Sequence, residues 1–173
     1  KTIEVARLHH MESIRNKKIA ILGGTGPVGQ ISAIIAAQIG ANAVITSRRE
    51  DYVKSLAKDL TKKAGKKAKS IEGAAAATEL DYYNVIKDAD IIWSVGKAGV
   101  QMVSKKTLGD LSPKKIVVDI NLVPPYGIEG MKPNFYNDEF VPGIFGIGAL
   151  DIGRLKYKIE KKIFELATVT IGK

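Results

Sequence analysis

The sequence predicts an α/β protein with a doubly wound, mostly parallel sheet and helices on both faces. Short apolar runs alternate with segments in which apolar residues recur every three or four positions, which is the pattern of strands alternating with helices. Right-handed crossovers between such strands make the sheet parallel and cover both of its faces. A glycine-rich segment, residues 23–29, follows the first apolar run. Because ligands of this fold class bind at the carboxyl ends of the strands, the functional residues are expected there.

Five apolar runs are the predicted strands. They cover residues 19–22, 43–46, about 69–71, 90–95 and 115–120. The third run is the weakest of them, since it is short and polar at its start. The fifth run leads into a turn-rich segment, residues 121–148, which holds four of the six prolines.

Six segments have the spacing of helices. Residues 3–15 precede the first strand, and residues 27–39, 53–64, 78–88 and 100–108 follow the first four strands in turn. Pro27 suits a first helical turn, and Gly40 marks the end of that helix. The last helix is marked by Ile152, Leu155, Ile159, Ile163 and Leu166.

Length and composition limit the class of protein. A chain of 173 residues suits one domain, and 45% hydrophobic with 26% charged residues is typical of a soluble globular protein. No apolar run reaches the roughly 18 residues of a membrane-spanning helix. The chain has no cysteine, and its only histidines are His9 and His10. These counts exclude a disulfide framework, a thiolate zinc site and a cysteine nucleophile, so no metal is expected.

The charge balance favours an anionic partner. The chain carries 27 Lys and Arg against 18 Asp and Glu, a net charge of +9. A phosphorylated cofactor and a nucleic acid both fit this charge, and a lysine-rich surface can also serve solubility alone. The lysines are spread along the predicted helices, and aromatic residues make up only 6% of the chain. A surface for stacking bases is therefore missing, and nucleic acid is not the expected partner.

The glycine loop matches the GxGxxG pattern. Its residues are Gly24, Thr25, Gly26, Pro27, Val28 and Gly29. The pattern follows a strand and opens a helix, which is the context of a dinucleotide-binding turn. We assign Gly24 to the tight turn, Gly26 to the close approach of a pyrophosphate, and Gly29 to helix–strand packing. The N–H groups and the positive dipole end of the helix then hold the phosphates. The alternative is a turn with only a structural role.

The ends of the second and fifth strands point to NADP. The second strand ends in Ser47-Arg48-Arg49, where NAD enzymes usually carry an acid. An arginine binds a 2′-phosphate through two hydrogen bonds, whereas a carboxylate would repel it. The acids Glu50 and Asp51 are expected to begin the next helix. Asn121, after the fifth strand, is expected to meet the nicotinamide or its ribose. For Arg48 and Arg49 the alternative is a solvated turn, and for Asn121 it is an ordinary Asn in a turn.

Several segments together resemble the NADP-dependent methylene-tetrahydromethanopterin dehydrogenases, some of which also act on methylene-tetrahydrofolate. They are the glycine loop, Ser47-Arg48-Arg49, Asp119-Ile120-Asn121, Pro124-Pro125-Tyr126-Gly127-Ile128, Phe145-Gly146 with Gly148, and Leu155-Lys156. The resemblance runs from about Lys17 to Glu165, and the order of the segments is more specific than any one of them. It implies a Rossmann-type domain that moves a hydride between NADP and a tetrahydropterin carrying a one-carbon unit.

The resemblance also bears on domain organisation. Members of that family have an N-terminal segment that supplies much of the pterin site, whereas about 16 residues precede the first strand here. Residues 1–16 are therefore interpreted as an N-terminal helix or as the remnant of a substrate lobe. Residues 17–173 are interpreted as the NADP-binding domain, including the C-terminal helix. The segment Ala149-Leu150-Asp151 departs from the glycine pattern of the relatives.

The implied chemistry suits a chain with almost no histidine. Oxidation of a methylene bridge between two nitrogens removes a hydride, and those nitrogens stabilise the resulting cation. The protein must position the reactants and need not carry a proton.

By resemblance, two further groups of residues join the site. Val95-Gly96-Lys97 line the nicotinamide side, and Lys156 is the catalytic candidate near the pterin. The alternatives are a glycine that only ends a strand and a solvated helix lysine. We further expect a tetrahydropterin substrate, a homo-oligomer, no membrane association and a cytoplasmic location. The competing functions are a non-catalytic NADP-binding module without the substrate lobe and another Rossmann dehydrogenase, of the shikimate dehydrogenase type.

Overall fold

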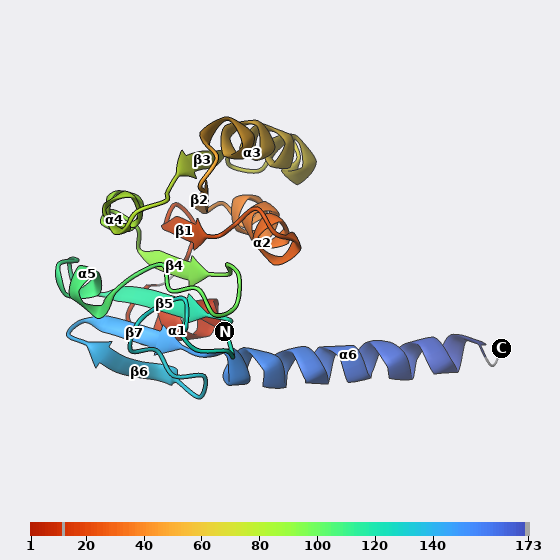
Figure 1. Ribbon diagram of the computed structural model, residues 1–173. Coiled ribbons are helices and arrows are strands. Elements are labelled where there is room, and N and C mark those ends of the chain that lie inside the picture. The colour runs from red at the N-terminus through yellow and green to blue at the C-terminus, as the bar shows by residue number, and fades with distance from the viewer. Residues whose placement is uncertain (12, 172–173) are drawn as a thin grey trace.

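A seven-stranded sheet with helices on both faces forms the body of the protein in the computed structural model, which describes residues 1–11 and 13–171 (Figure 1). The strands are β1 (Lys18–Leu22), β2 (Asn42–Ser47), β3 (Ile71–Ala75), β4 (Ile91–Ser94), β5 (Lys115–Asp119), β6 (Tyr136–Val141) and β7 (Ile144–Ile147). The helices are α1 (Thr2–Leu8), α2 (Pro27–Gln38), α3 (Glu50–Ala64), α4 (Glu79–Ile86), α5 (Lys105–Gly109) and α6 (Ala149–Ile171).

The strand order β3-β2-β1-β4-β5-β7-β6 confirms the predicted fold class. Every neighbouring pair is parallel except β6 with β7. The chain runs outward from β1 to β3 and then returns to β4 on the other side of β1. The carboxyl ends of β1 and β4 therefore flank the point where the topology reverses, and ligands of open α/β sheets bind at such a point.

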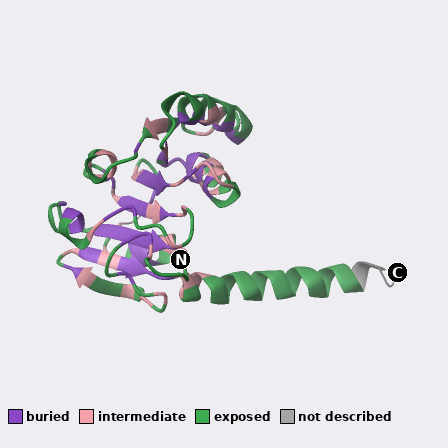
Figure 2. Ribbon diagram, viewed as in Figure 1, coloured by how far each residue is buried: buried purple, intermediate pink, exposed green. Residues whose placement is uncertain are grey.

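Two apolar cores cover the two faces of the sheet. One joins α1, α2 and α3 to side chains such as Ile19 and Ile116, and the other joins α4 and α5 to side chains such as Leu22 and Val117. The figures show α2 and α3 on one side of the sheet, and α4 and α5 on the other (Figures 1 and 2). The body is thus a three-layer sandwich, as expected for parallel strands linked by helices.

The N-terminal helix is shorter than predicted. It ends at Leu8, and His10 has a φ of 60°, which no continuing helix allows. Residue 12 of the predicted segment lies outside the described residues. Val5 of α1 is fully buried in the same core as β1, and the ring of His9 stacks on Phe145 at 3.6 Å between centroids. Helix α1 is therefore packed into the body that carries the sheet.

Two predictions for the second half of the chain are wrong in part. Only Lys105–Gly109 is helical in the segment predicted to be a helix over 100–108. The N–H groups of Met102 and Val103 donate to the carbonyl of Gly127, at 2.8 and 3.2 Å, instead of to a helix. The segment 121–148, predicted to be turns, contains β6 and β7. The third strand lies at residues 71–75, a few residues beyond its predicted place.

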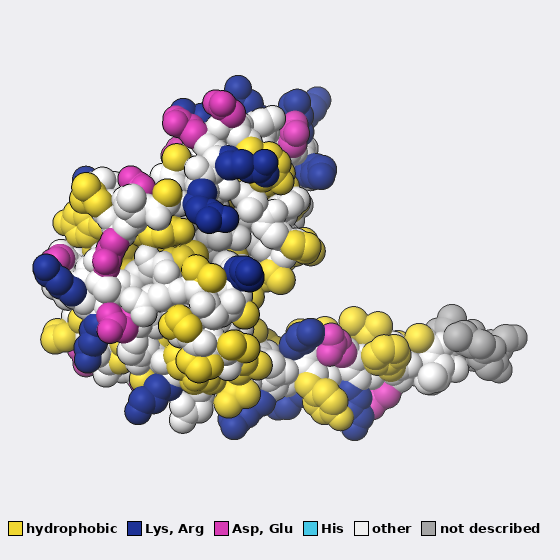
Figure 3. All heavy atoms as spheres, in the orientation of Figure 1, with side chains coloured by type: hydrophobic (Ala, Val, Ile, Leu, Met, Phe, Trp, Pro, Cys, Tyr) yellow, Lys and Arg dark blue, Asp and Glu magenta, His cyan; other side chains and the backbone are white. Residues whose placement is uncertain are grey.

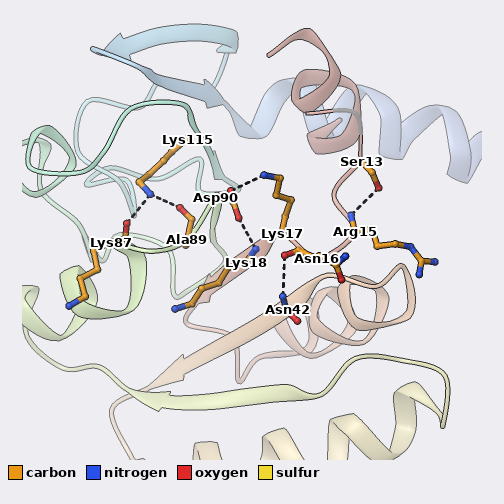
Figure 4. A network of polar contacts seen from close by, with 10 residues as sticks. All are labelled: Ser13, Arg15, Asn16, Lys17, Lys18, Asn42, Lys87, Ala89, Asp90 and Lys115. Atoms are coloured by element: carbon orange, nitrogen blue, oxygen red, sulfur yellow. Dashed lines mark hydrogen bonds and ion pairs between the residues drawn. The ribbon is translucent and has the colours of Figure 1, made fainter. Parts of the chain in front are cut away.

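The amino edge of the sheet is closed by polar side chains (Figure 4). Asp90 accepts from Lys17 Nζ at 3.2 Å and from the backbone N–H of Lys18 at 2.9 Å. Lys115 is only 4% exposed, and its Nζ donates to the carbonyls of Lys87 and Ala89 at 2.9 and 2.6 Å. These bonds tie the beginnings of β1, β4 and β5 together.

Candidate cofactor site

The glycine loop makes two close contacts between strands before it reaches α2. Gly23 has a φ of +70°, and a Cβ on it would lie 2.4 Å from the Cα of Gly96, after β4. Its N–H donates to the hydroxyl of Thr46, at the end of β2, at 3.0 Å. A Cβ on Gly24 would lie 2.9 Å from the Ile21 carbonyl and from the Ile45 side chain. The positive φ of the turn therefore falls at Gly23, while a side chain on Gly24 would collide with the Ile21 carbonyl of the same turn and with Ile45.

Gly26 and Gly29 have opposite surroundings. A Cβ on Gly29 would lie 2.4 Å from the Cα of Gly24, so Gly29 lets α2 pack closely on the turn after β1, where packing against the strand itself was predicted. A Cβ on Gly26 would meet nothing within 4 Å. Gly26 is also the N-cap of α2, with Pro27 at the first position, and no side chain caps this helix among the described residues. The loop thus leaves open space over the first N–H groups of α2, which is the arrangement that holds a phosphate.

Two exposed arginines follow β2. Arg48 and Arg49 are both exposed, and the guanidinium of Arg49 lies 4.4 Å from the centre of the Tyr52 ring. Glu50 begins α3, as predicted, and its carboxylate pairs with Lys54 at 2.5 Å. This pairing holds the pKa of the Glu50 carboxyl below its usual value. Glu50 is therefore paired along the helix, and the two arginines follow a strand that ends without a carboxylate.

A buried carboxylate joins the ends of β4 and β5. Asp119 is 3% exposed and accepts from Ser94 Oγ at 3.2 Å and from the N–H groups of Asn121 and Ile128 at 3.0 and 2.9 Å. Burial raises the pKa of this carboxyl, although the hydrogen bonds oppose the change. A Cβ on Gly127 would lie 2.0 Å from Ser94 Oγ, so only glycine allows the loop to return this close.

Asn121 carries an unpaired donor. Its side chain is 6% exposed, and its Nδ2 has no hydrogen-bond partner among the described residues. Buried amide groups are nearly always paired in native proteins. This orphan donor lies at the end of β5, within the set of residues expected to meet the nicotinamide.

The remaining site residues divide into two groups. Val95 lines a largely apolar cavity of about 240 Å³, together with Val28, Trp93, Ile120, Ile152 and Leu155. Gly96 packs between Gly23 and Met102, and Lys97 is exposed after β4. Lys156 lies on α6, its side chain 72% exposed and paired with Glu160 at 3.6 Å. The structure therefore brings Val95 and Gly96 to the glycine loop but places Lys156 on a helix that projects from the body (Figure 1).

Four residues of the site have roles that the sequence did not predict: Gly23, Thr46, Asp119 and Gly127. Asp119 and Gly127 belong to two of the segments that carry the family resemblance, which assigns neither of them a role. The signal for Thr46 and Asp119 is a polar residue at the end of an apolar run, where a side chain can reach neighbouring strands. No local signal marks Gly127, since its requirement comes from Ser94 on another strand.

Within the described residues, no group of three His, Asp or Glu side chains is placed to hold a metal ion. Among the helices over residues 1–11 and 13–171, none has both the length and the apolar character needed to cross a bilayer.

The strand order and the glycine loop between β1 and α2 define a Rossmann-type α/β domain. A family described as NADP oxidoreductase, coenzyme F420-dependent, matches residues 18–122, which is more than half of the chain. The chain belongs to this family. The naming of NADP in its description agrees with the cofactor expected from Arg48 and Arg49.

Two curated relatives carry the resemblance stated from the sequence. The NAD(P)-dependent methylenetetrahydromethanopterin dehydrogenase of Methylorubrum extorquens is 33% identical over 154 residues, which cover 87% of this chain and 50% of that protein. The Bifunctional protein MdtA of the same organism is 32% identical over 157 residues, 88% of this chain and 53% of that protein. The resemblance is therefore confirmed, and the chain spans about half the length of the curated relatives it matches.

Solved structures show the same fold at low identity. A transhydrogenase from Sinorhizobium meliloti superposes with a TM-score of 0.59 at 20% identity, over 76% of this chain and 38% of that one. A dipicolinate synthase chain from Bacillus halodurans gives a TM-score of 0.55 at 20% identity, over 74% of this chain and 38% of that one. At these identities the likeness concerns the fold alone.

Proposed function

We propose that the chain binds NADP at the carboxyl edge of the sheet and takes part in hydride transfer between NADP and a methylene-tetrahydropterin. The observation that carries the proposal is the open space over Gly26 at the uncapped start of α2, with Arg48 and Arg49 exposed at the end of β2. The two features fit a pyrophosphate and a 2′-phosphate respectively. The names of the two curated relatives support the pterin as substrate.

The residues present fit the cofactor. The N–H groups at the start of α2 and the loop from Gly24 to Gly29 would hold the pyrophosphate, and Arg48 and Arg49 the 2′-phosphate. The unpaired Nδ2 of Asn121 is a donor suited to a carboxamide oxygen, Val95 lines the apolar cavity that would take the nicotinamide, and Gly96 follows it beside Gly23. NADP supplies a hydride acceptor at its nicotinamide ring when bound.

The chain's own residues position the reactants and carry no proton. A bridge carbon between two nitrogens loses a hydride with electronic help from those nitrogens, so the step needs no general base. This agrees with Asp119, a carboxylate at the carboxyl edge of the sheet, being buried and occupied by three hydrogen bonds. The contribution of the protein is orientation of the bridge carbon against the nicotinamide. We retain Lys156 as the residue expected on the pterin side.

An assay of turnover tests this function. The chain is supplied with NADP and either methylene-tetrahydromethanopterin or methylene-tetrahydrofolate, and NADPH is followed by its absorbance. We expect weak formation of NADPH with at least one pterin unless a second chain completes the cleft, and we expect Lys156→Ala to lower turnover with little change in NADP affinity. Lys158→Ala, on the same helix, is the matched control. Because the family description also names coenzyme F420, the reduced form of that coenzyme is tested as an alternative hydride donor.

The outcomes separate the competing functions. NADP binding without turnover of either pterin identifies a non-catalytic NADP-binding module. Turnover of a hydroxy acid such as shikimate instead of a pterin identifies a dehydrogenase of the shikimate type. Absence of NADP binding contradicts the proposal as a whole. The homo-oligomeric state and the cytoplasmic location stay predictions.

A further inference from the structure

The two arginines that follow β2 have different neighbours. The guanidinium carbon of Arg49 lies over the ring of Tyr52, which belongs to the first turn of α3, at 4.4 Å from the ring centre. The charge of Arg48 acts instead on Tyr82 of α4, where it opposes the rise in the pKa of the tyrosine hydroxyl that burial causes. Because α3 and α4 pack on opposite faces of the sheet, the two arginines have their neighbours on different sides of it.

Tyr52 does not belong to the core of the protein. The residues that α3 buries against the sheet are Val53, Ala57, Leu60 and Ala64. Tyr52 lies outside this stripe and is 41% exposed. Its ring is in contact with the guanidinium of Arg49 instead of with the sheet. Removal of the ring should therefore cost the fold little, which makes Tyr52 a residue whose role can be tested in a folded chain.

Arg49 is not paired with the acids that follow it in the sequence. Glu50 and Asp51 come directly after it, and a guanidinium can form an ion pair with a carboxylate of either kind. Over the residues that the structure describes, Arg49 makes no ion pair, and Glu50 pairs with Lys54 at 2.5 Å. A cation held over an aromatic ring is bound through its charge, so its N–H donors stay available for another group.

The surface around β2 and α3 suits an anion. In the space-filling view, basic side chains gather over this region of the visible face, and the acidic side chains there lie toward its outer rim (Figure 3). A phosphate monoester offers oxygens that match the planar fork of N–H donors of an arginine. An arginine that is already ordered loses less side-chain freedom when a phosphate binds than one that moves freely in water.

We propose that Tyr52 is a positioning residue of the NADP site, whose ring holds Arg49 away from the neighbouring acids with its donors free for the 2′-phosphate. This inference rests on the proposed function, since it requires the cofactor to be NADP. Tyr52 acts through Arg49 and does not itself bind the phosphate. It therefore contributes to the affinity for NADP, and it contributes nothing to the affinity for NAD, which lacks the 2′-phosphate.

Substitution of the ring tests this role by calorimetric titration with NADP and with NAD. Tyr52→Leu should weaken NADP binding about three- to tenfold, the effect of freeing one long side chain, and should leave NAD affinity unchanged. Tyr52→Phe keeps the ring and should bind NADP as the wild type does. Tyr157→Leu, at an exposed tyrosine of α6, is the matched control and should change neither affinity. Circular dichroism of each variant confirms that it is folded.

A double-mutant cycle shows whether the ring acts through Arg49. In an Arg49→Ala background, Tyr52→Leu should have no further effect on NADP affinity, because the group that the ring positions is gone. In an Arg48→Ala background, Tyr52→Leu should weaken NADP binding as much as it does in the wild type. The two arginine variants remove the same charge, so the comparison separates positioning from the loss of positive charge.

Each other outcome overturns the proposal. Equal losses of NADP and NAD affinity in Tyr52→Leu would make the ring a contact for the part that the two cofactors share. Unchanged NADP affinity in Tyr52→Leu would show that Arg49 needs no positioning, and weaker binding by Tyr52→Phe would assign the effect to the hydroxyl. An effect of Tyr52→Leu that persists without Arg49 would mean that the ring acts on its own. Failure of the proposed function looks different, because the wild-type chain itself would then bind NADP no better than NAD, and both proposals would fall.

Discussion

The polar groups at the two edges of the sheet differ in whether they have hydrogen-bond partners. At the amino edge, Asp90 accepts hydrogen bonds from the start of β1, and Lys115 donates to two carbonyls after α4. At the carboxyl edge, the start of α2 has no side-chain cap among the described residues, and Asn121 Nδ2 has no partner among them. Both edges lie at the ends of the same buried strands, so burial alone does not explain the difference.

The difference marks where a ligand is expected. Unpaired buried donors cost stability, and a fold retains them where an incoming group completes the bonds. Thr46 and Asp119 lie at the carboxyl edge too, but they pair with backbone N–H groups and hold the loops in place. The amino edge therefore serves folding, while the carboxyl edge combines a rigid frame with donors that have no partner among the described residues. Substitutions at the two edges should separate stability from binding.

The largest expected effect is on binding, at Gly26. Gly26→Val fills the open space over the start of α2, so NADP affinity should fall at least 100-fold, which is about 2.7 kcal/mol. Because no atom lies within 4 Å of the new Cβ, the melting temperature should change little. Fluorescence titration and thermal melting measure the two quantities. Gly109→Val, at another uncrowded glycine far from the loop, is the control. A folded Gly26→Val chain with unchanged affinity would show that the loop is only structural.

Substitution of Gly127 should lower both the stability of the chain and its affinity for NADP. In Gly127→Ala the new methyl would lie 2.0 Å from Ser94 Oγ, so either the loop after Asn121 or the Ser94 hydroxyl that bonds Asp119 must move. We expect a loss of about 2 kcal/mol in the free energy of unfolding and weaker NADP binding by the folded fraction. Urea unfolding and titration of the same sample check both, with Gly109→Ala as the control. Full stability and affinity in the Gly127→Ala chain would mean that the loop does not depend on this close approach.

Lys115 should affect stability alone. Lys115→Met removes the donor from two carbonyls at the amino edge, and we expect a loss of about 1–2 kcal/mol with unchanged NADP affinity. Arg154→Met, at an exposed position of α6, is the control. Weaker cofactor binding by folded Lys115→Met would break the separation between the two edges.

The same lysine predicts a smaller effect of pH. Burial holds the pKa of the Lys115 ammonium below its usual 10.5. The unfolded chain then binds the proton more tightly than the folded chain, so stability rises as pH increases through the window below 10.5. The free-energy cost of burying the charged ammonium is greatest at pH values below the pKa that Lys115 has in the folded chain. The advantage in unfolding free energy of the wild type over Lys115→Met should therefore grow as the pH rises toward 10.5. An advantage that shrinks with pH would mean that folding raises the pKa of Lys115 instead of lowering it.

Local signals in the sequence predicted most of the sheet and the glycine loop. The runs at β1, β4 and β5 are apolar because both faces of a parallel sheet are buried, and Gly26 and Gly29 follow from their spacing. The strand β6 is not predicted from the sequence because it is an edge strand with mostly exposed, polar residues. The helix predicted over 100–108 failed because Met102 and Val103 pair with Gly127, a partner distant in sequence. The roles of Asp119 and Gly127 likewise arise only when β4 and β5 lie side by side.

The preference between NADP and NAD tests the central claim most directly. Isothermal titration of the wild-type chain with each cofactor should show NADP binding at least tenfold more tightly, which is about 1.4 kcal/mol. The double variant Arg48→Ala, Arg49→Ala should lose this preference and keep its NAD affinity, because both arginines follow β2 and no acid ends that strand. The variant Lys62→Ala, Lys63→Ala removes the same charge at the far end of α3 as a control. Equal affinities of the wild-type chain for NADP and NAD would contradict the assignment of this edge as an NADP site.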